Sequence, residues 1–160
     1  MAGNEKSIEM ALRYKTQGVI LQRKDVGEAH RVFTVFTKEF GKVLVWAVSE
    51  RKIGSKLRGG LELFSLSHLE FVEGKERRVL VEAICLEQQV FLKNDLRKIQ
   101  AAQGMCEFLD RLVGEEQGDL ELWDLLRSSF AELKDHGSPK AVYSLFVSRA
   151  LEAAGYGARN

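Results

Sequence analysis

The first half of the chain alternates hydrophobic and polar positions in short stretches separated by turn residues. The stretches 14–23, 30–37 and 43–48 are rich in β-branched and aromatic residues, and 61–71 and 78–86 follow the same pattern. Period-two alternation of this kind is typical of strands that bury one face. The sequence therefore predicts five β-strands before residue 87.

The second half of the chain follows a different period. From Asn94 onward, hydrophobic residues recur mostly at three- and four-residue spacing, which is typical of amphipathic helices. We expect Asn94 to cap the first helix and the second helix to begin near Asp119. Ser138 and Pro139 supply an N-cap and a first-turn proline for a third helix, which is expected to run to Gly155.

The change of pattern between Glu87 and Asn94 predicts two domains, at 14–87 and 92–157. Five short strands with glycines at their bends fit a small closed barrel, because an open sheet would leave hydrophobic edges unpaired. We therefore expect an α+β chain: a five-stranded oligonucleotide-binding (OB-fold) barrel followed by a small all-α helical domain.

Charge divides the chain in the same way. Residues 1–80 hold 15 Lys and Arg against 10 Asp and Glu, and residues 81–160 hold 9 against 13, so net charges of +5 and −4 lie behind the overall +1. The longest basic run is Arg51-Lys-Ile-Gly-Ser-Lys-Leu-Arg58, which contains no acid and is closed by two glycines. This asymmetry indicates a polyanion such as nucleic acid as partner of the basic half. The alternative is an ordinary solvated loop.

Four aromatic residues of the predicted strands are candidates for stacking on nucleobases: Phe33, Phe36, Trp46 and Phe71. Alternation places Phe33 on one face of its strand and Phe36 on the other. We expect most of the four to belong to the barrel core.

Composition excludes several classes of protein. No hydrophobic run approaches the roughly 20 residues of a membrane helix, and charges interrupt the first residues where a signal peptide needs a hydrophobic stretch, so we expect a cytoplasmic protein. Cys85 and Cys106 lie far apart among hydrophobic residues and are expected to be buried free thiols, with no metal site. His30, His68 and His136 lie in different elements and no phosphate-binding loop motif is present, so we expect no enzyme and no cofactor.

Three stretches of the sequence resemble a known family. Gly27-Glu-Ala-His-Arg-Val-Phe-Thr-Val-Phe-Thr-Lys-Glu-Phe-Gly-Lys-Val43 and Leu57-Arg-Gly-Gly-Leu-Glu-Leu-Phe-Ser65 resemble the amino-terminal barrel of the bacterial recombination mediator RecO. Leu145-Phe-Val-Ser-Arg-Ala-Leu-Glu-Ala-Ala-Gly-Tyr156 resembles the helix and Gly-Tyr step that close the helical region of that family. The resemblance covers about residues 14 to 157.

The resemblance implies a DNA repair and recombination mediator without catalytic turnover. Such a protein binds single- and double-stranded DNA without sequence specificity, promotes strand annealing, and assists loading of recombinase onto DNA coated by single-strand-binding protein (SSB). The implied partners are DNA, the C-terminal tail of SSB, and possible RecR-like and recombinase proteins, with a place at the nucleoid. The alternative is a protein-interaction adaptor that uses the barrel as a scaffold and binds SSB or another repair protein without contacting DNA.

The resemblance implies individual DNA-binding residues in this sequence. The Arg after the first turn of the family falls on Arg31, and Lys42 is a further phosphate candidate from its charge and position alone. The basic loop of the family falls on Arg51, Lys52, Lys56 and Arg58.

Partner binding is expected on the last helix, where Lys140 and Arg149 are the available cations for an acidic SSB tail; the alternative is ordinary solvated charge. Leu145 stands before Phe146 where the family tends to have Arg. Members of the family usually continue into a region with zinc-binding cysteines, whereas this chain stops at Asn160 without them. We therefore expect either a truncated form or a naturally short relative.

Overall fold

The structure is a computed structural model that describes residues 12–48, 59–135 and 137–156. The described residues form two compact units. The first contains 12–37, 43–48 and 59–88, and the second contains 38–42 together with the described residues from 89 onward. The domain boundaries expected from the sequence stay a prediction.

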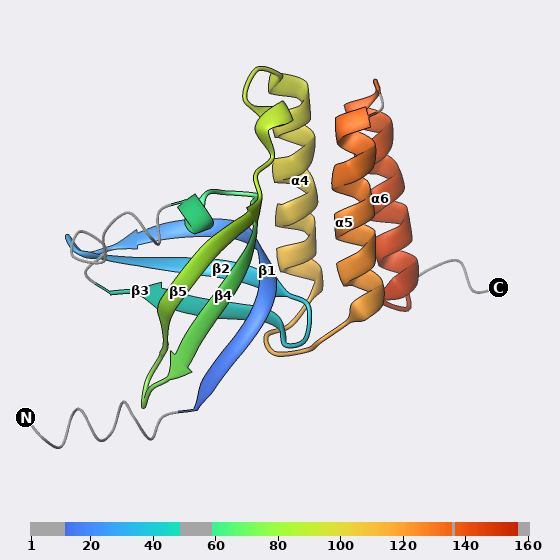
Figure 1. The fold of residues 1–160 in the computed structure, drawn as a ribbon. Coiled ribbons are helices and arrows are strands. Elements are labelled where there is room, and N and C mark those ends of the chain that lie inside the picture. The colour runs from blue at the N-terminus through green and yellow to red at the C-terminus, as the bar shows by residue number, and fades with distance from the viewer. Residues whose placement is uncertain (1–11, 49–58, 136, 157–160) are drawn as a thin grey trace, which may run out of the picture. The chain divides into compact units, whose positions relative to one another are not determined.

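The first unit is a closed barrel with the strand order β1-β2-β3-β5-β4 (Figure 1). Its strands are β1 (Arg13–Val26), β2 (His30–Thr37), β3 (Gly41–Ala47), β4 (Leu66–Glu73) and β5 (Arg78–Glu87). The first half of β1 pairs with β4 and the second half pairs with β2, both antiparallel. One long curved strand is thus hydrogen-bonded to two neighbouring strands. The parallel pair β3–β5, with Trp46 in register with Val79, closes the barrel. This architecture confirms the predicted fold class.

Side chains that point into the barrel form its hydrophobic core. Phe33, Val35, Val45 and Leu69 are fully buried, as the period-two pattern predicts. Phe36 is also fully buried, although it lies on the other face of β2. Phe71, the third aromatic candidate of the strands, is 1% exposed.

The start of the fourth strand differs from the sequence prediction. Alternation predicts a strand over 61–71, but β4 begins at Leu66 and is preceded by a short 3-10 helix, η1 (Gly59–Leu61). Phe64 has a φ of 69°, a left-handed conformation that ends any extended strand at that point. The hydroxyl of Ser67 donates to the carbonyl of Gly60 at 2.7 Å and so fixes the chain across the bend.

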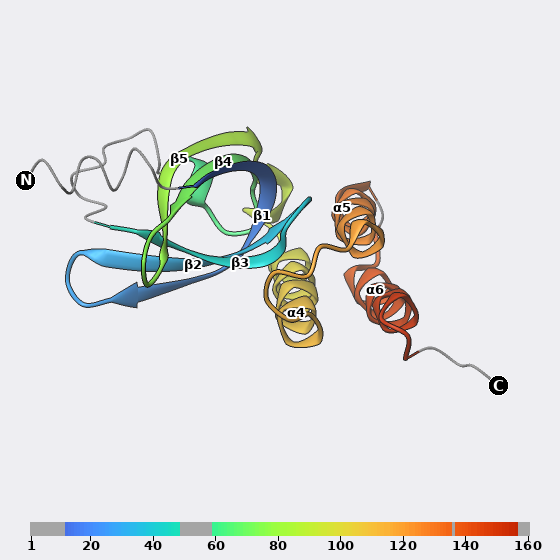
Figure 2. The ribbon, with the colours of Figure 1, turned by 90° about the horizontal axis from the view of Figure 1, so that it is seen from below.

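The second unit contains the 3-10 helix η2 (Val90–Leu92) and three α-helices, α4 (Leu96–Leu112), α5 (Leu120–Asp135) and α6 (Pro139–Ala153). Figure 2 looks almost along their axes and shows them side by side, and α6 packs against both other helices. The hydrophobic stripes supply the core: Met105, Leu109, Leu122, Leu126, Leu133 and Phe146 are at most 2% exposed. Within the described residues no helix is long and apolar enough to cross a membrane.

The observed helix caps agree in part with those predicted from the sequence. Ser138 accepts a hydrogen bond from the amide of Ala141, and Pro139 opens α6, as predicted. The cap of α4 is Asp95 and not Asn94, because the Asp95 carboxylate accepts hydrogen bonds from the amides of Arg97 and Lys98. The helix α6 ends at Ala153, two residues before the predicted end.

The two thiols differ in burial. Cys106 on α4 is 1% exposed, as predicted, whereas Cys85 on β5 is only half-buried, which corrects the expectation for that residue. Burial raises the pKa of both thiols because it disfavours the charged thiolate.

Candidate nucleic-acid interface

The basic run of the sequence follows the third strand of the barrel. β3 ends at Ala47 and η1 begins at Gly59, so Arg51, Lys52, Lys56 and Arg58 lie between them in the sequence, outside the described residues. Their predicted DNA contacts stay predictions. The described strands show which side chains lie near the end of β3.

Barrel closure brings a turn beside the end of β3. Because β5 runs parallel to β3, its first residue, Arg78, is in register with Val45, and the β4–β5 turn lies next to Trp46. The guanidinium carbon of Arg77 lies 4.3 Å from the centroid of the Trp46 ring. The His30 ring lies 6.4 Å from the same ring, edge-on. We call His30, Trp46 and Arg77 the Trp46 platform.

Among the four aromatic candidates from the sequence, only Trp46 is accessible. Phe33, Phe36 and Phe71 are at most 1% exposed and belong to the core, whereas Trp46 is half-buried on β3. The structure thus confirms the expectation that most of these rings are core residues. Trp46 is the one ring of these four that is partly exposed to solvent.

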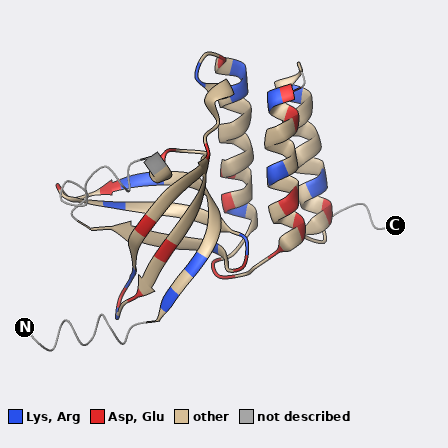
Figure 3. Cartoon of the chain, in the orientation of Figure 1, with Lys and Arg blue, Asp and Glu red and all other residues tan. Residues whose placement is uncertain are grey.

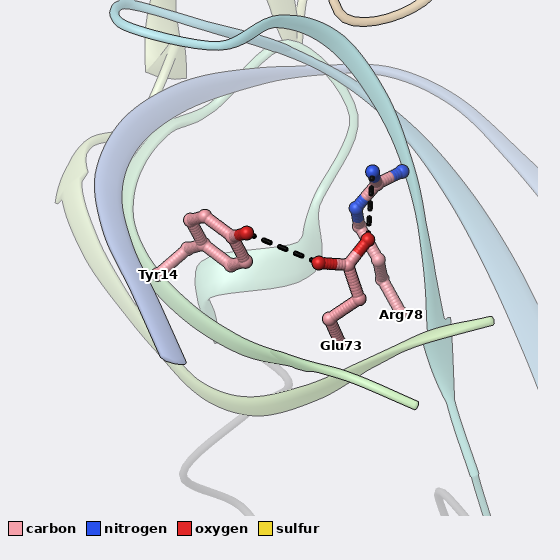
Figure 4. Close-up of polar contacts among 3 residues, drawn as sticks. All are labelled: Tyr14, Glu73 and Arg78. Carbon is pink, nitrogen blue, oxygen red and sulfur yellow. Dashed lines mark hydrogen bonds and ion pairs between the residues drawn. The ribbon is translucent and has the colours of Figure 1, made fainter. Parts of the chain in front are cut away.

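A polar network holds the end of the β4–β5 hairpin (Figure 4). Arg78 donates from Nη2 to Glu73 Oε1 at 3.4 Å, and the hydroxyl of Tyr14 donates to Glu73 Oε2 at 3.0 Å. The hydrogen bond to the Glu73 carboxylate, more than burial, raises the pKa of Tyr14. These contacts fix Arg78 inside the hairpin and separate its role from that of its neighbour Arg77.

Charges of both signs lie on the barrel strands (Figure 3). Across β1, β4 and β5, Lys15, Glu70 and Glu82 stand in one register row, and Arg13 pairs with Glu70 at 3.1 Å. Two carboxylates in this row repel phosphate. The β1–β2 hairpin and the β4–β5 turn carry the exposed cations Arg23, Lys24, Lys75 and Arg77 together with the exposed carboxylates Asp25, Glu28 and Glu76.

Arg31 lies at the start of β2 and forms an ion pair. Its Nε donates to Asp25 Oδ1 of β1 at 2.8 Å, in a register pair of the hairpin. Both side chains are substantially exposed, at 37% and 71%. An exposed pair of this kind contributes only about 0–1 kcal/mol, so a phosphate can compete for the guanidinium.

Lys42 is held inside the second unit. Its Nζ lies 3.0 Å from Asp110 Oδ1 and donates to the Asp110 carbonyl at 2.8 Å, and its side chain is 14% exposed. The amide of Glu116 donates to the Lys42 carbonyl at 2.8 Å. The contact with DNA predicted for Lys42 stays a prediction, but these bonds give its charge a structural role.

The helical unit contains a cleft of about 420 Å³ between α4 and the start of α6. Arg97 and Lys140 contribute cations, Ala101 and Tyr143 contribute apolar surface, and Ser138 marks the helix N-terminus. This combination suits a short acidic peptide with apolar side chains. Arg97 was missed by the sequence analysis, since a single charge on an exposed helix face gives no signal of the cleft.

The second predicted partner residue lies elsewhere on the same helix. Arg149 follows Lys140 by nine residues, or two and a half helical turns, so the two side chains leave α6 on opposite sides. Arg149 approaches Glu132 of α5 at 4.0 Å. The structure therefore does not bring the two predicted cations together.

Comparison with known sequences covers nearly the whole chain. Residues 10–88 match the family described as "Recombination protein O N terminal" and residues 93–159 match "Recombination protein O C terminal". Proteins named "DNA repair protein RecO" from Gloeothece citriformis, a Roseiflexus species and Heliobacterium modesticaldum are 34%, 31% and 32% identical over 84%, 89% and 89% of the chain. The matches span 47%, 50% and 52% of those proteins, so the chain spans about half the length of the curated relatives it matches.

Proposed function

Because the chain belongs to the RecO family, we propose that it takes part in DNA repair and recombination by binding DNA strands through its barrel. The main support is that the basic run of residues 51–58 is inserted between β3 and β4 of a closed five-stranded barrel. In OB-folds, loops and strand faces of the barrel bind oligonucleotides. The proposal includes no catalytic step.

The proposed mechanism is electrostatic. Cations of the basic run, with Arg31 at the β1–β2 hairpin, neutralise phosphates and release counterions, which supplies affinity without reading base sequence. Two strands held at reduced mutual repulsion then pair with each other, which is the strand annealing that we propose. The Asp25 carboxylate competes with phosphate for Arg31, so we expect Arg31 to contribute less than a loop cation.

A binding measurement tests this proposal. Fluorescence anisotropy of a labelled single-stranded oligonucleotide should show affinity falling at least about tenfold when Arg51, Lys52, Lys56 and Arg58 are all replaced by Ala. The matched control replaces four exposed lysines and arginines elsewhere, Lys38, Lys93, Arg111 and Lys134, and so removes the same net charge. Equal losses in both variants would mean that overall charge, not the basic run, determines binding.

The cleft of the helical unit supports a protein partner as well. We propose that the C-terminal tail of SSB binds there, with its acidic side chains at Arg97 and Lys140 and its apolar side chains against Tyr143. Arg149 stays a separate prediction for tail binding. RecR-like and recombinase partners, and a cytoplasmic place at the nucleoid, remain proposals from the family relationship.

The cleft also keeps the adaptor alternative open. An adaptor would bind the tail peptide and show no affinity for DNA, whereas the DNA-binding proposal requires both activities. Measuring both on the quadruple loop variant separates them. Loss of DNA binding with tail binding unchanged supports direct DNA contact by the barrel, and absence of DNA binding already in the unaltered chain supports the adaptor.

A further inference from the structure

In the Trp46 platform an exposed cation covers the aromatic ring. The Arg77 guanidinium lies 4.3 Å from the ring centroid, and Arg77 is an exposed residue of the β4–β5 turn. The other barrel rings proposed for stacking are enclosed by core side chains. A ring covered by a solvent-exposed side chain is available for exchange with another flat group.

The surroundings of Arg77 fix its backbone and leave its side chain at the surface. The amide of Gly74 donates to the Arg77 carbonyl at 3.0 Å and closes the turn. The neighbouring Arg78 is held by Glu73. The backbone of Arg77 is thus held in the hairpin end beside β3.

We propose that the Trp46 platform binds an unpaired base of single-stranded DNA and so makes the barrel prefer single strands to duplexes; this rests on the proposed function. A base stacks on the Trp46 ring in place of the Arg77 guanidinium, which then pairs with the adjacent phosphate. The His30 ring lies steeply inclined to the same ring, with 6.4 Å between the centroids, and limits where the base can lie.

Magnitudes favour the exchange. An exposed cation–aromatic contact changes an equilibrium by about two- to fivefold, whereas stacking of a base on an aromatic side chain changes affinity by about five- to 150-fold. The displaced guanidinium gains a charge-assisted hydrogen bond to phosphate. Bases in a duplex are already stacked on each other and are not available to the Trp46 ring. Only the phosphates of a duplex can contact the platform.

The test compares oligothymidylate with a duplex of the same length on the full chain. Trp46→Ala should weaken single-strand binding about five- to 50-fold and duplex binding less than about twofold. Arg77→Ala should weaken binding of both ligands, and more than Lys75→Ala, which removes the same charge from the same turn without touching the ring.

Fluorescence provides a second readout that does not depend on the stability of a Trp46 variant. The chain has two tryptophans, and the other, Trp123, is 3% exposed in the helical unit. In a Trp123→Phe variant, saturation with oligothymidylate should quench the remaining Trp46 emission, and duplex should not.

Three results would contradict the proposal that the Trp46 platform binds a base. Unchanged Trp46 emission at saturation, or equal losses of single-strand and duplex affinity in Trp46→Ala, would contradict base stacking on Trp46. Neither result would contradict DNA binding by the cations. Failure of the unaltered chain to bind either ligand at low salt would remove the platform and the proposed function together.

Discussion

The ammonium of Lys42 lies 3.0 Å from the Asp110 carboxylate and also donates to the Asp110 carbonyl, so one side chain satisfies two acceptors of α4. Both side chains are largely buried, at 14% and 24% exposure. A charge in such a position is costly to leave unpaired. Lys42 therefore has a structural function that its position just after a hairpin turn does not reveal.

Replacing Lys42 by Ala should lower the free energy of unfolding by about 1–3 kcal/mol, because the largely buried Asp110 would lose both contacts with the Lys42 ammonium. Denaturant unfolding measures this change. The control Lys38→Ala removes an exposed lysine of the same segment and should change stability by less than about 0.5 kcal/mol. If Lys42→Ala left stability unchanged but weakened DNA binding as much as a loop substitution, its main role would be the phosphate contact predicted from the sequence.

Gly41 should be far less tolerant of substitution than Gly27. Both have positive φ, 68° and 65°, so alanine at either position costs about 1 kcal/mol in backbone strain. A Cβ at Gly41 would also overlap the carbonyl of Gln117, whereas nothing lies near a Cβ at Gly27. Denaturant unfolding should therefore show a loss for Gly41→Ala at least about 1 kcal/mol larger than for Gly27→Ala. Equal losses of stability in the two variants would mean that the backbone at Gln117 moves aside at little energetic cost.

Binding of an acidic peptide with the sequence of an SSB C-terminal tail should depend on the cleft of the helical unit. Arg97→Ala and Lys140→Ala should each weaken binding by about threefold to tenfold, since each removes one cation from the cleft. Arg149→Ala tests the separate prediction for the opposite side of α6, and Arg111→Ala, which removes an exposed arginine of α4 that does not line the cleft, is the matched control. Calorimetric titration measures the four affinities. A loss limited to Arg149→Ala would place the tail outside the cleft.

The two thiols should react at very different rates with a thiol-specific disulfide reagent. Cys85 is half-buried and should react in the native protein, while Cys106 is 1% exposed and should react only on unfolding. Because burial raises the pKa of Cys85, its rate should still be rising with pH where that of a free thiol has levelled off. The variant Cys85→Ser should show no native-state reaction. Two equally fast thiols would contradict the burial of Cys106.

The sequence predicted the barrel and the helices well because both depend on local periodicity. Strands that bury one face and helices with a hydrophobic stripe leave period-two and three-to-four patterns, and Ser138-Pro139 is a local cap signal. The prediction failed at 61–65, where the alternation continues but Phe64 adopts a left-handed conformation. A pattern of side chains does not record such a bend.

The sequence marks the basic run by its charge and Trp46 as one of four aromatic candidates, but it does not show which side chains lie beside them. The run 51–58 is visible in the sequence, but the stack of Arg77 on Trp46 depends on the parallel β3–β5 pair, which joins segments about thirty residues apart. The ion pair of Lys42 with Asp110 likewise links positions 68 residues apart. Tertiary contacts of this kind decide which cations stay available for a phosphate. The charge of each residue in the sequence does not reveal these contacts.

The most direct test of DNA binding by the barrel is the dependence of single-strand affinity on salt concentration. If about four to five cations each meet one phosphate, log affinity should fall against log salt with a slope of roughly −3 to −3.5. The variant lacking the four loop cations should then have a slope closer to zero by about 3 units. A slope near zero in the unaltered chain would contradict the account.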